Sequence, residues 1–153
     1  MVDASSRRLF EQFVGRTLPK SAWDHAAHLT VCWVALDSMD TADAVTFLRD
    51  AISSYNEATG VTNSTTEGYH DTITEYFVGA VASLAADDID DVIGADRCHR
   101  EAPLRHWSRA RLFSPVARAR WVDPDLAPLP WDEHRRAGRV NPASTGCPPP
   151  QPA

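Results

Sequence analysis

The sequence lacks the features that mark secreted, membrane or nucleotide-binding proteins. No apolar run approaches the roughly 18 residues of a membrane-spanning helix, and the first residues lack the apolar stretch of a secretory signal. The three cysteines contain no CxxC pair, so the sequence predicts neither a disulfide framework nor a zinc knuckle. No Gly-rich phosphate loop and no GxSxG motif is present. We therefore expect a soluble, cytoplasmic protein.

Lysine is nearly absent, because Lys20 is the only lysine among 15 basic residues. The basic side chains are outnumbered by 21 acidic ones, and the formal net charge is −6. A negative net charge disfavours polyanionic partners. We therefore expect neither nucleic acid nor a membrane as a partner.

Proline is rare in the first two thirds of the chain and frequent afterwards. Ten of the 11 prolines lie at or after Pro103. Because proline has no backbone N–H donor, such a region favours extended coil. We expect one helical domain over residues 1–137, with its core at about residues 5–122 and a proline-rich strap at 123–137 packed on its surface. Residues 138–153 are expected to be a disordered tail.

Apolar residues recur at helical spacing in four segments. We expect helices at residues 5–14, 23–36, 42–58 and 69–86, with Ser21 and Thr41 as N-caps of the second and third. Residues 87–91 are expected to form either an acidic helix start or a solvated turn, and we favour the solvated turn. One short helix is expected within residues 103–113, and Ser114-Pro115 is expected to open another. With no strand pattern, the prediction is an all-α fold: an antiparallel four-helix-bundle-like core with extra short C-terminal helices.

Three histidines are the candidate metal ligands. His25 and His28 lie three residues apart on the second predicted helix, so their side chains are neighbours on one face. His70 begins the fourth predicted helix, which would run parallel to the second, so that their N-terminal ends meet. The spacing predicts that the three imidazoles hold one divalent transition metal and leave a position open for water or substrate. Zinc, iron, nickel and copper all suit three nitrogen ligands.

Polar residues near these histidines are the candidates for catalysis and substrate binding. Glu67 or Asp71 would act as the general base or orient a ligand imidazole. The candidates for contacts to a small-molecule substrate are Tyr55, Asn56, Tyr69 and Thr72, together with Arg109 for a substrate carboxylate. Asn56 suits helix C-capping equally well. The first hypothesis is therefore a metal-dependent enzyme, with hydrolysis or elimination at zinc, or oxygen chemistry at iron or copper.

The second hypothesis is a non-enzymatic helical module that binds a ligand or a partner. Its histidines would be hydrogen-bonded structural groups. The aromatic candidates for lining its pocket are Trp23, Trp33, Tyr55 and Tyr69. The later tryptophans, Trp107, Trp121 and Trp131, would either form the surface of a homodimer or cover the bundle.

Several motifs resemble those of a family of small, largely uncharacterised bacterial helical proteins. The matching pieces are WDHAAHL at 23–29, Tyr55-Asn56, GYHDT at 68–72, LFSP at 112–115 with Ala117-Arg118, and VDPDLAPLP at 122–130. The resemblance covers roughly residues 20–131 and implies no assigned reaction. A looser similarity is to the DinB-like four-helix proteins, which hold one metal through three histidines. Their paired histidines have HxxxH spacing on the last helix, whereas this chain has HxxH on the second.

Overall fold

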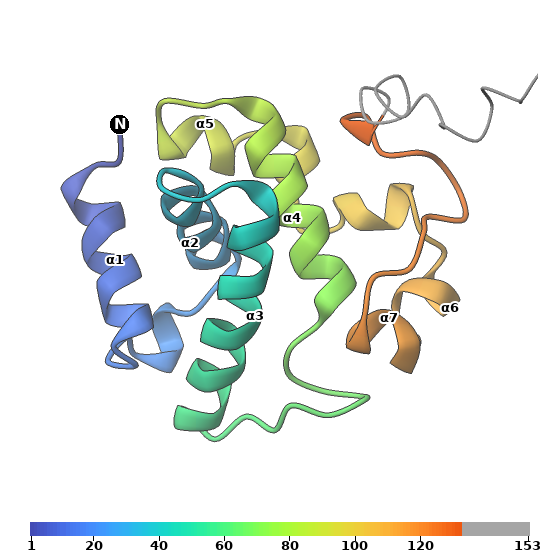
Figure 1. Ribbon diagram of the computed structural model, residues 1–153, viewed down its shortest axis with the longest axis horizontal. Helices are drawn as coiled ribbons and strands as arrows, with labels where there is room; N and C mark the ends of the chain where they lie inside the picture. The colour runs from blue at the N-terminus through green and yellow to red at the C-terminus, as the bar shows by residue number, and fades with distance from the viewer. Residues whose placement is uncertain (133–153) are drawn as a thin grey trace, which may run out of the picture.

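Four helices of 11 to 18 residues make up most of the first half of the chain (Figure 1). In the computed structural model, which describes residues 1–132, these are α1 (Ala4–Val14), α2 (His25–Leu36), α3 (Thr41–Ala58) and α4 (Asp71–Leu84). The described residues form helices and no strand, which confirms the predicted all-α fold. Helix α1 packs against α2 and α3, and α4 packs against α2 and α3. The four-helix bundle topology stays a prediction.

Each of the four helices begins where a side chain accepts a hydrogen bond from a backbone N–H of the first turn. Asp3, Asp24, Asp40 and His70 are the N-caps. The predictions of Ser21 and Thr41 as caps were wrong. Ser21 lies in a short 3₁₀ helix, η1 (Lys20–Ala22), and Thr41 is the first residue of α3, because the carboxylate before it accepts the bond.

The core lies around α2, which is buried on nearly all sides, as its apolar sequence predicts. Its residues from Leu29 to Ala35 are all buried. The largest fully buried side chains from the rest of the chain include Phe13, Leu48, Tyr55, Tyr76, Trp107, Leu112 and Leu129. No helix within residues 1–132 combines the length and the apolar character needed to cross a membrane.

Residues 89–119 form mainly short helices. They are α5 (Ile89–Ile93), η2 (Asp96–Cys98), η3 (Ala102–Arg105), α6 (Arg109–Leu112) and α7 (Pro115–Ala119). The prediction of a solvated turn at 87–91 was wrong for residues 89–91, which belong to α5. Asp88 caps α5 through the amide of Asp90, and Val92 is fully buried, so the segment folds as a helix.

After α7 the chain runs as coil over the ends of the short helices. The indole Nε1 of Trp107 donates to the carbonyl of Val122, and the amide of Leu126 donates to the carbonyl of His106. Leu129 is buried in the core. We call residues 121–132 the strap. The rest of the predicted strap, 133–137, and the predicted tail, 138–153, lie outside the described residues.

Candidate functional site

The two histidines of α2 contact different parts of the molecule. Nε2 of His25 lies 2.8 Å from the carbonyl oxygen of Cys98. Nδ1 of His28 lies 2.7 Å from the carbonyl oxygen of Asp24, and its ring packs on Trp23 with ring centres 3.8 Å apart. Because a carbonyl oxygen only accepts, each of these ring nitrogens carries the proton and donates it.

His70 uses both of its ring nitrogens. Nε2 donates to the carbonyl oxygen of Leu112 at 2.7 Å, and Nδ1 accepts from the amide of Ile73 at 3.2 Å, which caps α4. A neutral imidazole has one donor and one acceptor, so this ring has no lone pair left for a metal ion. His70 is buried, at 8% exposure, and joins two segments that are 42 residues apart.

The structure does not bring His25, His28 and His70 together as one metal-binding group. Within residues 1–132 no group of three or more histidine, cysteine or acidic side chains is placed to hold a metal ion. The physical reason is that the two helix starts face different neighbours. His25 donates to Cys98 beside α2, whereas His70 donates to Leu112 at the end of α6. The arrangement therefore does not fit the predicted three-histidine centre.

The two predicted general bases lie in unlike surroundings. Glu67 is exposed in the loop before α4. Asp71 is 2% exposed and accepts three hydrogen bonds, from Nε and Nη2 of Arg49 at 2.9 and 3.2 Å and from the hydroxyl of Tyr69 at 2.7 Å. Burial, followed by the bond to Asp71, raises the pKa of Tyr69, and the same carboxylate raises the pKa of Arg49. Asp71 is therefore the buried centre of an ion-pair and hydrogen-bond network whose arginine is exposed.

The predicted substrate contacts bind backbone or neighbouring side chains instead of lining a common cavity. Tyr55 donates to the carbonyl of Leu18 at 2.8 Å, and Asn56 donates to the side-chain oxygen of Asn63 at 3.0 Å. Arg109 is exposed on α6. The fifth predicted contact, Thr72, is fully buried.

The start of α4 holds the segment that contains α6 and α7. Besides the bond from His70 to Leu112, the hydroxyl of Thr72 donates to the carbonyls of Ala117 and Arg120 at 2.7 and 3.0 Å. In return, Nη1 of Arg118 donates to the carbonyl of Gly68 at 2.8 Å. We call His70, Thr72 and Arg118 the clasp. It connects the GYHDT motif to the LFSP and Ala117-Arg118 motif, so these motif residues have a direct structural role.

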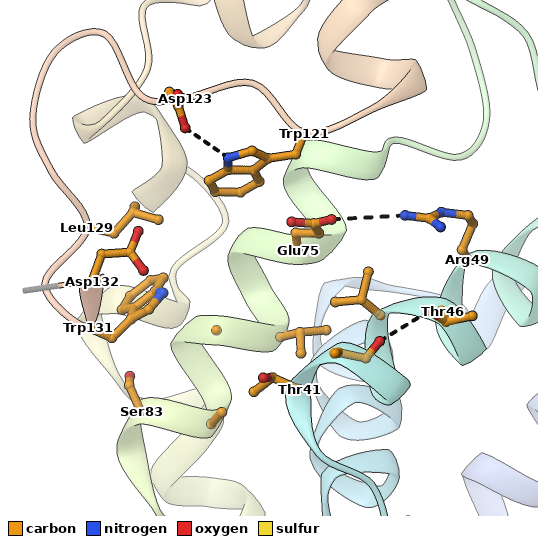
Figure 2. A pocket seen from close by; sticks show the side chains of 15 residues that line it. Thr41, Thr46, Arg49, Glu75, Ser83, Trp121, Asp123, Leu129, Trp131 and Asp132 are labelled. Atoms are coloured by element: carbon orange, nitrogen blue, oxygen red, sulfur yellow. Dashed lines mark hydrogen bonds and ion pairs between the residues drawn. The ribbon is translucent and has the colours of Figure 1, made fainter. Parts of the chain in front are cut away.

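An open groove of about 920 Å³ lies between α3, α4 and the strap. Its floor is formed by short side chains on α3 and α4, and its wall by the strap (Figure 2). The lining residues of α3 are Thr41, Ala42, Val45, Thr46 and Arg49, and those of α4 are Glu75, Val78, Gly79, Ala82 and Ser83. The strap contributes Trp121, Asp123, Leu129, Trp131 and Asp132.

Sequence reasoning assigned no site role to the groove residues, apart from the open interpretation of Trp121 and Trp131. The sequence contains one sign of the groove: small side chains recur on one face of α3 at spacings of three and four residues. That spacing does not say which distant segment covers the face.

Trp131 depends on a glycine of α4. A Cβ atom at Gly79 would lie 2.5 Å from the indole Nε1 of Trp131, so only glycine lets the ring pack there. The other tryptophan of the wall, Trp121, donates from Nε1 to Asp123 at 3.2 Å. Both indoles are held by contacts within the protein.

Two substitutions at His70 separate its two hydrogen bonds. We expect His70→Ala to lower the free energy of unfolding by about 2–4 kcal/mol, because it removes an N-cap and leaves the buried carbonyl of Leu112 without its donor. His70→Asn keeps an acceptor near Nδ1, and His70→Gln keeps a donor near Nε2. Each is expected to recover part of the loss in denaturant unfolding. An alanine variant as stable as the wild type would contradict the clasp.

Stability is expected to fall on mild acidification. Burial lowers the pKa of His28 and of His70 below the ordinary value near 6.5. In the unfolded chain these imidazoles take up protons near that pH, whereas in the folded chain they stay neutral until the pH is lower. The free energy of unfolding therefore decreases as the pH falls through about 6.5. Carboxylates titrate mainly below about pH 5, so they contribute little to the change in stability near pH 6.5.

The measurement is denaturant unfolding of the wild type and of His70→Gln between about pH 7.5 and pH 5.5. The variant should lose less stability over this range. His99→Gln, at an exposed position, is the control and should behave as the wild type. Equal stability of the wild type at both ends of the range would refute the assignment.

Comparison with known proteins gives no matching family model, no matching curated protein and no matching solved structure. The functional argument therefore rests on this chain's own residues and their geometry.

Proposed function

We propose that the protein is a non-enzymatic binding module that takes a small organic cation, a positively charged group on an apolar body, in the groove between α3, α4 and the strap. The observation that carries the proposal is the lining of the groove. Two indoles and three carboxylates border a recess of about 920 Å³, which falls in the usual range of about 300–1,000 Å³ for small-molecule sites.

The indoles supply attraction for a cation. The face of a tryptophan ring attracts cations by about 0.5–2 kcal/mol. Trp131 already interacts in this way within the protein, because the guanidinium carbon of Arg97 lies 5.9 Å from its ring centre. Trp121, on the same wall, offers a second aromatic surface.

The charges of the groove favour the same class of ligand. Among the described residues that line the groove, the one basic side chain is Arg49. It forms a two-bond ion pair with Asp71 and lies 4.0 Å from Glu75. This guanidinium is therefore already compensated within the protein. The carboxylates of Asp123 and Asp132 add negative charge along the strap wall. An anionic ligand would be repelled by this wall, whereas a cation would be attracted to it.

The groups in the groove support binding rather than turnover. Within residues 1–132, no histidine or cysteine is among its lining residues. Two of its hydroxyls, those of Thr46 and Ser83, donate to carbonyls of their own helices. A nucleophile beside a general base, the usual sign of covalent catalysis, is therefore missing from this lining.

The test is isothermal titration calorimetry with benzyltrimethylammonium as the probe and benzenesulfonate as its anionic counterpart. We expect binding of the cation and none of the anion. Trp131→Ala should weaken binding about tenfold, a loss of about 1.4 kcal/mol. Asp123→Asn combined with Asp132→Asn should weaken it by a similar factor. Asp50→Asn, an exposed carboxylate on α3 outside the groove, is the matched control and should leave affinity unchanged.

Gly79→Ala is a second test that does not remove a groove side chain. Alanine is favoured over glycine inside a helix by up to about 1 kcal/mol, so α4 should persist. The new Cβ displaces the ring of Trp131, and affinity for the probe should fall.

Binding of the sulfonate in place of the cation would overturn the proposal, as would equal affinity in the Trp131 and Asp50 variants. Elemental analysis distinguishes this proposal from the hypothesis of a metal-dependent enzyme. One equivalent of metal in the wild type, lost in His25→Ala, His28→Ala and His70→Ala, would favour the enzyme instead.

A further inference from the structure

The net charge of −6 conceals a strong segregation of charge along the chain. Residues 1–96 carry 16 acidic and five basic side chains, whereas residues 97–122 carry seven arginines and one glutamate. The arginine-rich segment includes α6 and α7, which lie at the opposite side of the molecule from α1 (Figure 1). One segment of the chain is therefore basic although the whole chain is acidic.

Exposed residues of α6, α7 and their C-caps include both arginine and apolar side chains. Phe113 is 52% exposed and Val116 is 47% exposed. Arg109 precedes Phe113 by four residues, and Arg120 follows Val116 by four. Backbone hydrogen bonds join both pairs, from the amide of Phe113 to Arg109 and from the amide of Arg120 to Val116. We call these four residues the Arg–Phe patch.

The two arginines of the patch are available for a partner. Within residues 1–132, neither Arg109 nor Arg120 has a side-chain hydrogen bond or an ion pair. Both residues are exposed. Two other arginines of this segment are engaged within the protein: Arg105 with Asp96, and Arg118 in the clasp.

The underside of the patch is fixed. Leu112 and Ala117 are buried beneath it, at 1% and 0% exposure, and their carbonyls accept the bonds from His70 and Thr72. A surface held in this way is preorganised for binding, so little conformational entropy is lost when a partner binds.

We propose that the Arg–Phe patch docks a short acidic segment of a partner protein. An apolar side chain of that segment would contact Phe113 and Val116, and carboxylates on either side would pair with Arg109 and Arg120, since guanidinium and carboxylate match in planar two-bond geometry. This site is separate from the groove and does not depend on the proposed function.

The surroundings favour a short segment over an extended polyanion. The strap lies beside α6 and carries Asp123 and Asp125, whose contacts with Arg111 and Ser108 place them next to the patch. A nucleic acid or an anionic bilayer would extend over these carboxylates and over the acidic remainder of the chain. A segment of a few residues would touch only the patch.

Fluorescence anisotropy of a labelled peptide tests the proposal. The probe is a synthetic peptide in which a Leu-Phe pair is flanked on both sides by Asp-Glu pairs. We expect binding to the full-length protein at low ionic strength that weakens as salt is added. The double variant Arg109→Glu and Arg120→Glu should lose at least tenfold in affinity, and Phe113→Ser should lose several-fold.

The matched control is Arg7→Glu with Arg8→Glu, two exposed arginines of α1, which change the net charge by the same amount. Because all these positions are exposed, the fold should persist in every variant. Absence of peptide binding at low salt would overturn the proposal, as would an equal loss in both double variants. Tighter binding of a single-stranded oligonucleotide or of phosphatidylserine vesicles than of the peptide would also overturn it, in favour of an extended polyanion.

Discussion

The imidazole of His70 donates to the carbonyl of Leu112 and accepts from the amide of Ile73, and the placement of α6 against α4 depends on this ring. The nearby hydroxyl of Thr72 donates to the carbonyls of Ala117, within α7, and of Arg120, just after α7. Without these bonds, short helices of four and five residues would have little to hold them, since such helices are not stable alone. The clasp thereby fixes the Arg–Phe patch and the start of the strap, which forms one wall of the groove.

The sequence allowed the helices of the first half to be predicted because their apolar spacing is a local signal. It also predicted the burial of α2, whose residues are apolar on nearly all sides. The cap of α2 and the helix α5 were not predicted, because each depends on which of several neighbouring polar side chains accepts the hydrogen bond from a backbone amide. In the structure the accepting side chains are those of Asp24 and Asp88.

The candidate site was harder to predict, because a histidine motif has the same spacing whether its nitrogens meet a metal ion or a carbonyl. His25, His28 and His70 were the candidate metal ligands, but in the structure their ring nitrogens bind carbonyl oxygens, at Cys98, Asp24 and Leu112. Two of these partners lie more than 40 residues away in the sequence, in segments whose placement no local pattern gives. The groove has the same difficulty, because its tryptophan wall comes from the strap.

The imidazoles of His25 and His70 connect distant segments of the fold through the hydrogen bonds that they donate. The most direct measurement is the ¹⁵N NMR spectrum of the histidine rings, recorded near neutral pH before and after addition of Zn²⁺. The account predicts that His70 is neutral with its proton on Nε2, that a coupling is seen across the bond to the Leu112 carbonyl, and that zinc leaves its signals unchanged. Movement of the His25, His28 and His70 ring signals together at one equivalent of zinc would contradict it.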